Sequence, residues 1–173
     1  MTLSLYDASV PVFVNALTNM RAWLDKAAAA GAEAVLLDAR LAPDMRPLTA
    51  QYQMASDTAK NGLARLVGET PPAMADTEAS FADLRDRCDR TIAYLKSIDP
   101  ARLADSATRT VEMKFPGGQG WRFTGLSYLT GFALPNFFFH ATTAYAILRA
   151  NGVDVGKADF LAHLGAPVML EDA

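Results

Sequence analysis

A regular line of polar side chains runs through a strongly apolar stretch of the sequence, residues 134–152. Asn136, His140 and Thr143 recur there at i, i+4 and i+7, which places them on one face of a helix. An imidazole can exchange a proton near neutral pH or bind a metal ion, and the amide and hydroxyl beside it can orient a ligand. A buried polar group without a partner costs about 1–3 kcal/mol. We therefore expect these side chains to meet polar partners or a ligand in a pocket between helices.

The partners are expected on a second helix, predicted for residues 48–66. Gln51, Tyr52 and Asp57 are the nearest polar candidates on it. Asp57 either faces the cavity and orients His140 as a base, or is solvated beside its polar neighbours. For His140 three interpretations stay open: a core histidine satisfied by its neighbours, a side chain that contacts a ligand, and a metal ligand. The expected pocket consists of Gln51, Tyr52, Asp57, Asn136, His140 and Thr143.

Apolar residues at spacings of three and four predict the long helices that must position this pocket. Pro11 either lies in the first turn of the first helix or kinks it, and Asp7 or Ser9 is its expected cap. Gly68 ends the second helix, and Thr77 is the expected cap of the third. The predicted long helices cover about residues 10–30, 48–66, 77–98 and 134–152.

Between the third and fourth helices the apolar period changes from 3.6 to 2. Val111, Met113 and Phe115 alternate with charged residues, and a glycine-rich turn at 116–120 precedes a second strand around Trp121. The sequence therefore predicts an all-α fold, an up-and-down four-helix bundle with a small β-hairpin between its third and fourth helices. With 173 residues, the chain 1–173 is expected to form a single domain.

Charge and composition exclude several classes of partner. The chain carries 16 basic and 19 acidic side chains, a net charge of −3, and the two signs are interleaved, so we expect no nucleic-acid partner. No apolar run has the length of a membrane span and the N-terminus has no signal pattern, so a cytoplasmic protein without membrane contact is expected. The charged run 83–90 predicts a solvated helix face. Cys88, the single cysteine, is expected to be a buried, inert thiol.

Several segments of the chain resemble a known group of proteins. The pattern His140-x8-Arg149-x2-Gly152, with the helix order and the hairpin, resembles the DinB and YfiT-like superfamily of bacterial four-helix bundles. More closely, the chain resembles an uncharacterised family within it, a domain of unknown function. The resemblance covers nearly the whole chain and implies the same bundle. The segments that carry it are Leu41–Met45 with Pro47–Leu48, Leu134–Phe137 with Phe139–His140, Ala144–Arg149 with Asn151–Val153, and Gly156–Leu161.

Metal-binding members of that superfamily hold a divalent ion on three histidines, one from the second helix and two at i, i+4 on the fourth. Only His140 matches this set; Asn136 stands at the first position of the pair, and the second-helix ligand falls near Gln51 or Tyr52. His163 is expected to be exposed in the tail. An amide oxygen is a poorer ligand for zinc or nickel than an imidazole. We therefore expect no cofactor and no tightly bound transition metal; a nearby carboxylate would rescue at most a labile manganese or magnesium ion.

The resemblance and an excess of apolar side chains together predict a homodimer. Phe137, Phe138 and Phe139 are too many aromatics for one inward stripe, so at least one should point outward. Either the hairpin or a helix face of a second copy is expected to cover it.

Three functions remain open at this stage. The preferred one is binding of a small molecule in a metal-free pocket around His140. One alternative is a DinB-like metal-dependent transferase or hydrolase acting on a small substrate such as a thiol, with His140 as base or sole metal ligand. The other is a structural or stress-associated interaction protein, in which the polar line fixes the register of the bundle. The sequence does not decide whether the protein is an enzyme.

Overall fold

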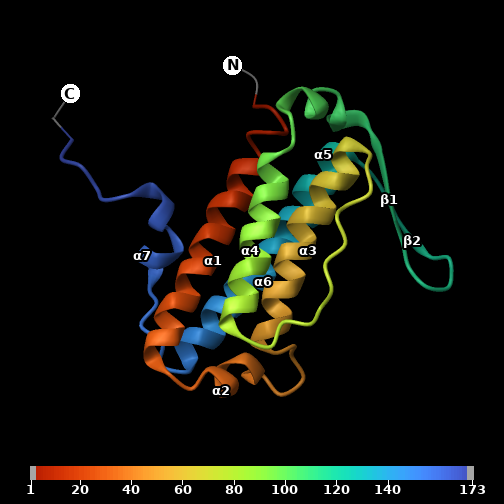
Figure 1. Cartoon of the computed structure of the whole chain (residues 1–173). Coiled ribbons are helices and arrows are strands. Elements are labelled where there is room, and N and C mark those ends of the chain that lie inside the picture. Colours follow the sequence, from red (N-terminus) through yellow and green to blue (C-terminus); the bar gives the residue numbers. More distant parts are fainter. Residues whose placement is uncertain (1–2, 171–173) are drawn as a thin grey trace.

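Four long helices form the body of the structure, a computed structural model that describes residues 3–170. They pack in the ring order α1, α4, α3, α6, each against two neighbours (Figure 1). A two-stranded hairpin precedes the last of them, so the predicted fold class is confirmed. The long helices are α1 (Val10–Ala30), α3 (Leu48–Val67), α4 (Phe81–Lys96) and α6 (Leu134–Ala150).

The helix ends follow local chemistry. Pro11 lies in the first turn of α1, where its missing N–H costs no hydrogen bond. Gly68 ends α3 at a φ of +77°, a left-handed conformation that glycine adopts without strain. The prediction that Thr77 caps α4 is wrong. Ser80 is the cap, because its side chain accepts a hydrogen bond from the backbone N–H of Asp83.

The connection from α3 to α4 runs along the length of the bundle instead of turning back at its end (Figure 1). As a result α3 and α4 are parallel. Gln53, early in α3, bonds to Glu78 just before α4, and Glu69, just after α3, bonds to Tyr94 late in α4. The predicted up-and-down order is therefore wrong here, since a long crossover replaces a short turn.

The hairpin packs against α5 (Gly125–Tyr128) at one side of the bundle, and α5 and the turn after it lead into the last long helix. Its strands β1 (Thr110–Lys114) and β2 (Gly120–Thr124) are antiparallel, with Val111 opposite Phe123. Glu112 and Arg122 form an exposed ion pair across the strands. Val111 is buried in the core and the half-buried Phe123 packs against it, so these two side chains fix the position of the hairpin on the bundle.

Short elements complete the chain. A π-helical turn at 129–133 joins α5 to α6, and Pro135, which has no N–H to donate, follows it at the start of α6. The other short helices are α2 (Glu33–Asp38), α5 (Gly125–Tyr128) and α7 (Lys157–Phe160).

The three consecutive phenylalanines of α6 separate by environment. Phe137 is fully buried and packs edge-on against Phe13 of α1, with ring centroids 4.9 Å apart. Phe138 is half-buried, whereas Phe139 is 55% exposed. At least one of the three therefore points outward, as predicted. The homodimer that would cover it stays a prediction.

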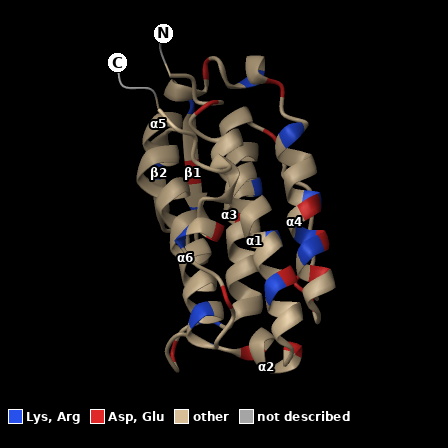
Figure 2. Cartoon of the chain, turned by 90° about the vertical axis from the view of Figure 1, so that its left-hand side faces the viewer, with Lys and Arg blue, Asp and Glu red and all other residues tan. Residues whose placement is uncertain are grey.

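Basic and acidic residues alternate along α4 (Figure 2). Arg21 of α1 pairs with Asp89, and Arg85 pairs with Asp25 of α1, so much of the charge lies in exposed ion pairs between two helices. Within the part of the chain that the structure describes, no helix combines the length and the apolar character that crossing a membrane needs.

Candidate functional site: a groove beside His140

His140 and Gln51 make a direct contact between α6 and α3. Nδ1 of His140 lies 2.8 Å from Oε1 of Gln51, and both side chains are buried. The amide nitrogen of Gln51 donates to the carbonyl oxygen of Arg46 at 2.9 Å. The amide oxygen of Gln51 must therefore face the ring, so Nδ1 of His140 carries the proton and donates it. This leaves Nε2 as the acceptor nitrogen.

Nε2 of His140 is the atom of this pair that can act on another molecule. Among residues 3–170 no protein partner of Nε2 is seen, and His140 lines the groove described below, so Nε2 is open to another molecule. Burial lowers the pKa of His140, which keeps the ring neutral at pH 7. The ring can therefore accept a hydrogen bond or a proton.

A groove with a volume of about 300 Å³ lies beside this ring. Its α3 wall extends from Met54 to Arg65, about 16 Å along the helix axis, so the groove is elongated. The groove lies between α3, α6 with the turn before it, and the hairpin. It is lined by Met54, Asp57, Thr58, Asn61, Arg65, Met113, Tyr128, Phe132, Asn136 and His140.

The two ends of the groove carry different polar groups. Near His140, Nδ2 of Asn136 donates to Oγ1 of Thr58 at 2.7 Å. At the other end, the guanidinium of Arg65 donates to the hydroxyl of Tyr128 at 3.1 Å and lies over its ring, 5.9 Å from the centroid. Among residues 3–170, Arg65 contacts an aromatic hydroxyl and pairs with no carboxylate, so its positive charge is available to an anion.

The structure brings three of the six predicted pocket residues to this groove: Asp57, Asn136 and His140. Gln51 lies behind the ring of His140 and takes the orienting role considered for Asp57. The carboxylate of Asp57 pairs instead with Arg87 at 2.8 Å and with Lys60 at 3.2 Å.

Tyr52 and Thr143 do not line the groove. The hydroxyl of Tyr52 donates to the carbonyl oxygen of Met20 in α1 at 2.8 Å, and burial raises its pKa well above the ordinary value. The hydroxyl of Thr143 donates to the carbonyl oxygen of Phe139 in its own helix at 2.7 Å. Both side chains are thus satisfied away from His140.

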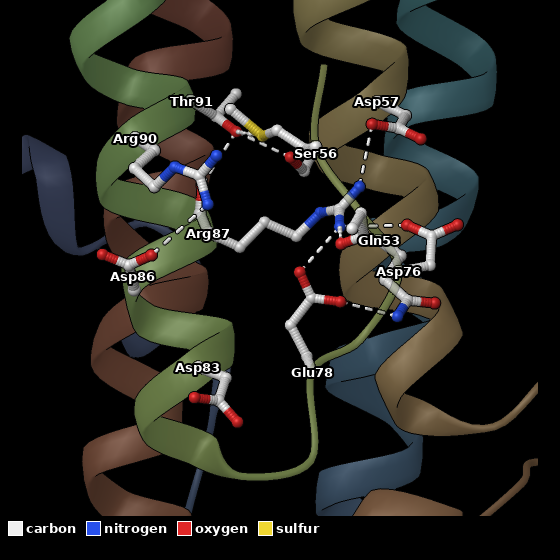
Figure 3. A network of polar contacts seen from close by, with 12 residues as sticks. Gln53, Ser56, Asp57, Asp76, Glu78, Asp83, Asp86, Arg87, Arg90 and Thr91 are labelled. Atoms are coloured by element: carbon white, nitrogen blue, oxygen red, sulfur yellow. Dashed lines mark hydrogen bonds and ion pairs between the residues drawn. The ribbon is translucent and has the colours of Figure 1, made fainter. Parts of the chain in front are cut away.

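Arg87 is the centre of a buried ionic network between α4, α3 and the crossover (Figure 3). It is 1% exposed, and its guanidinium reaches Glu78 at 2.7 Å, Asp76 at 3.0 Å and Asp57 at 2.8 Å. The prediction that residues 83–90 form a solvated face is therefore wrong at Arg87. Its ion pairs hold the crossover against the two parallel helices.

Cys88, the next residue, lies in the apolar core. Burial raises the pKa of its thiol to about 12, so no thiolate is present at neutral pH. The inert thiol expected from the sequence agrees with this environment.

Apart from Asp57, sequence reasoning missed the polar residues of α3 that line the groove. Thr58, Asn61 and Arg65 lie at i+4, i+7 and i+11 from Met54, so the signal was a second polar stripe with the same spacing as the stripe on α6. The aromatic wall formed by Tyr128 and Phe132 carried no comparable signal, because it depends on the path of the chain through the π-helical turn.

The donor groups around His140 do not fit a metal held by three histidines. Gln51 is engaged at both ends of its amide, and the carboxylate of Asp57 is shared by two cations. Across residues 3–170, no group of three or more His, Cys, Asp or Glu side chains is placed to hold a metal ion. His163 is exposed in the tail beside Asn19.

A bundle of four helices with a hairpin before the last, and a histidine of that helix facing α3, defines a DinB-like protein. The chain is similar, at 41% identity and a TM-score of 0.84, to the crystal structure of a DinB family member protein from Shewanella denitrificans; the similarity covers 98% of this chain and 95% of that one. Residues 5–161 match the family described as domain of unknown function DUF1993, and the chain belongs to that family. No curated protein matches the chain.

The tautomer of His140 leads to a testable expectation. In a Gln51→Glu variant a carboxylate replaces the amide beside Nδ1, and an adjacent negative charge favours the imidazolium. The pKa of His140 should rise by at least about one unit. Titration of the ring protons by NMR measures it, with His163 as the internal control. An unchanged pKa of His140 would show that Gln51 does not contact the ring in solution.

Proposed function

We propose that this protein binds a small organic acid in the groove beside His140. The observation that carries the proposal is the accessible, unprotonated Nε2 of His140, which Gln51 holds in one orientation. A ligand hydroxyl or amide would donate to it. At the other end of the groove, the guanidinium of Arg65 would bind the acidic group.

The walls between these two ends support a flat, partly apolar body for the ligand. Tyr128 and Phe132 stack with ring centroids 5.8 Å apart, and Met113 of the hairpin faces the same space. A volume of about 300 Å³ lies at the lower end of the range for small-molecule sites, so the ligand should be small.

The experiment is a thermal-shift screen with small aromatic and aliphatic carboxylates, each paired with its neutral amide. Acids should raise the melting temperature and their amides should not. A ligand at 100 times its dissociation constant stabilises the protein by about 2.7 kcal/mol. If no acid shifts the melting temperature, or if acids and amides act equally, the proposal is wrong.

Arg65→Met tests the anion end of the groove. Losing a charge-assisted contact should weaken binding of the acid by at least about tenfold, or 1.4 kcal/mol. Arg149→Met is the matched control, because this exposed arginine near the end of α6 pairs with Asp154 and does not line the groove. Equal losses in both variants would contradict a role for Arg65.

One feature favours an enzyme as the second candidate. A neutral histidine with a fixed Nδ1–H and an accessible Nε2 has the form of a general base. For a bound acid that turns over, Gln51→Glu would move the pH profile of the rate upward together with the pKa of His140. A profile that does not move would leave binding as the function.

A further inference from the structure

An apolar groove lies at the end of the bundle where the N-terminal segment meets α5. Its volume is about 520 Å³, and no charged side chain lines it. It shares no lining residue with the groove beside His140. Leu126, on its rim, is half exposed. Its apolar walls come mainly from Leu5, Ala8, Leu103, Ala107, Leu126 and Leu129.

A second unpartnered apolar feature is the segment Val168–Leu170. The three side chains are 77%, 95% and 85% exposed. Exposure of three consecutive large apolar side chains to water is unfavourable, since burying such a side chain fully is worth about 1.5–3 kcal/mol. The segment thus has a physical reason to bind an apolar surface.

The tail is anchored at a distance that lets it reach this groove. Nδ2 of Asn19 donates to the carbonyl oxygen of Phe160 at 2.8 Å and lies 3.1 Å from Nδ1 of His163. From Asn19 back to Val10, next to the groove, α1 rises about 14 Å. Six residues beyond His163 span about 20 Å when extended.

The direction of the tail agrees with this reach. In Figure 1 the tail between α7 and residue 170 runs toward the end of the bundle at which α1 begins. Gly165, at a φ of +72°, lies between the anchor and the apolar segment. A glycine there permits backbone conformations that other residues avoid, so the direction of the segment can change without strain.

We propose that Val168–Leu170 dock into the apolar groove of their own chain and cover it. The anchor at Asn19 keeps the segment at a local concentration in the millimolar range. A second copy at micromolar concentration competes poorly with that. The open arrangement of Figure 1 and the docked one are then two states of the tail, and docking closes the groove to other apolar molecules.

Disulfide trapping tests the proposal in the full chain. In a Leu126→Cys/Met169→Cys variant, oxidation should link the tail to the groove within one chain, at a rate at least about tenfold above the control. The control is Val35→Cys/Met169→Cys, which places a thiol on α2 at the opposite end of the bundle, at a position somewhat more exposed than Leu126. Non-reducing electrophoresis and peptide mapping identify the bonds, and buried Cys88 should not take part.

The outcomes are distinct. A bond within one chain that forms faster than in the control supports docking in its own groove. A bond between two chains means that a second copy supplies the tail, and equal rates in both variants mean that the tail does not dock; either result overturns the proposal. As a second measurement, Met169→Glu should raise the fluorescence of an added apolar dye severalfold by uncovering the groove, and unchanged fluorescence would also contradict it.

Discussion

Replacing Arg87 by methionine should lower the free energy of unfolding by about 3–5 kcal/mol, as expected when one partner of a buried ion pair is removed. Methionine keeps most of the volume but leaves the acids around it unpaired. Glu78 dominates the cost, because its side chain is nearly as buried as that of Arg87, whereas Asp57 and Asp76 are partly exposed. Urea unfolding followed by circular dichroism measures the loss.

Two further variants test this explanation. Arg90→Met on the same helix should change stability by no more than about 0.5 kcal/mol, because the Arg90–Asp86 pair is exposed. Arg87→Met/Glu78→Gln should be more stable than Arg87→Met, since it removes the stranded charge. If Arg87→Met unfolds with the same free energy as Arg90→Met, the network contributes little to the fold.

The same network makes a prediction about acid. Burial alone would raise the pKa of Glu78, but hydrogen bonds from Arg87 and Gln53 outweigh it and hold the pKa below the ordinary value of 4.5. A carboxyl with a lowered pKa in the folded state stabilises the fold above its ordinary pKa, and this contribution is lost as the pH falls through the folded-state pKa. The stability gap between the natural protein and Arg87→Met should therefore be widest near pH 7 and narrow below pH 4.5.

The role of Arg87 shows where sequence reasoning reached its limit. Arg87 lies three residues from Leu84 and four from Thr91, both buried, so helical spacing alone places it on the inward face. Its charged neighbours in the run 83–90 predicted instead that Arg87 is exposed to solvent. The acids that make burial acceptable come from α3 and from the crossover, and no local pattern predicts that contact.

The same limit explains why only some of the predicted pocket residues line the groove. Neighbouring helix positions differ by about 100° in direction, so Gln51 and Tyr52 must face different helices. The spacing predicted both as candidates, but the ring order of the bundle decides that Gln51 meets α6 and Tyr52 meets α1. Thr143 shares the face of His140, yet its hydroxyl bonds to its own helix, which any helical threonine can do.

Helix positions and most helix ends were predictable because their causes are local; the start of α4 at Ser80 instead of Thr77 is the exception. Apolar spacing, Pro11 and Gly68 each act within a few residues, and the structure agrees with them. The direction of α4 was not predictable from such signals. It depends on the crossover, which the buried charge of Arg87 and the amine of Lys60, bonded to the carbonyl oxygen of Pro72, hold along the bundle.

Phe137→Ala and Phe139→Ala should differ strongly although the two residues are two positions apart. Phe137 is fully buried between α6 and α1, and truncating a buried phenylalanine costs about 3–5 kcal/mol through lost burial and the cavity left behind. Phe139 is mostly exposed, so its truncation should change the free energy of unfolding by no more than about 0.5 kcal/mol.

Thermal and urea unfolding at low micromolar concentration compare the two variants, and light scattering at tens of micromolar gives their masses. Similar losses in both would mean that Phe139 is buried in solution by something other than its own chain. If the predicted homodimer covers Phe139, the lower stability of Phe139→Ala should be accompanied by a change in mass from two chains to one. If the natural protein has the mass of one chain, the dimer prediction is wrong. Phe139 is then an exposed neighbour of the His140 ring, with ring centroids 5.2 Å apart.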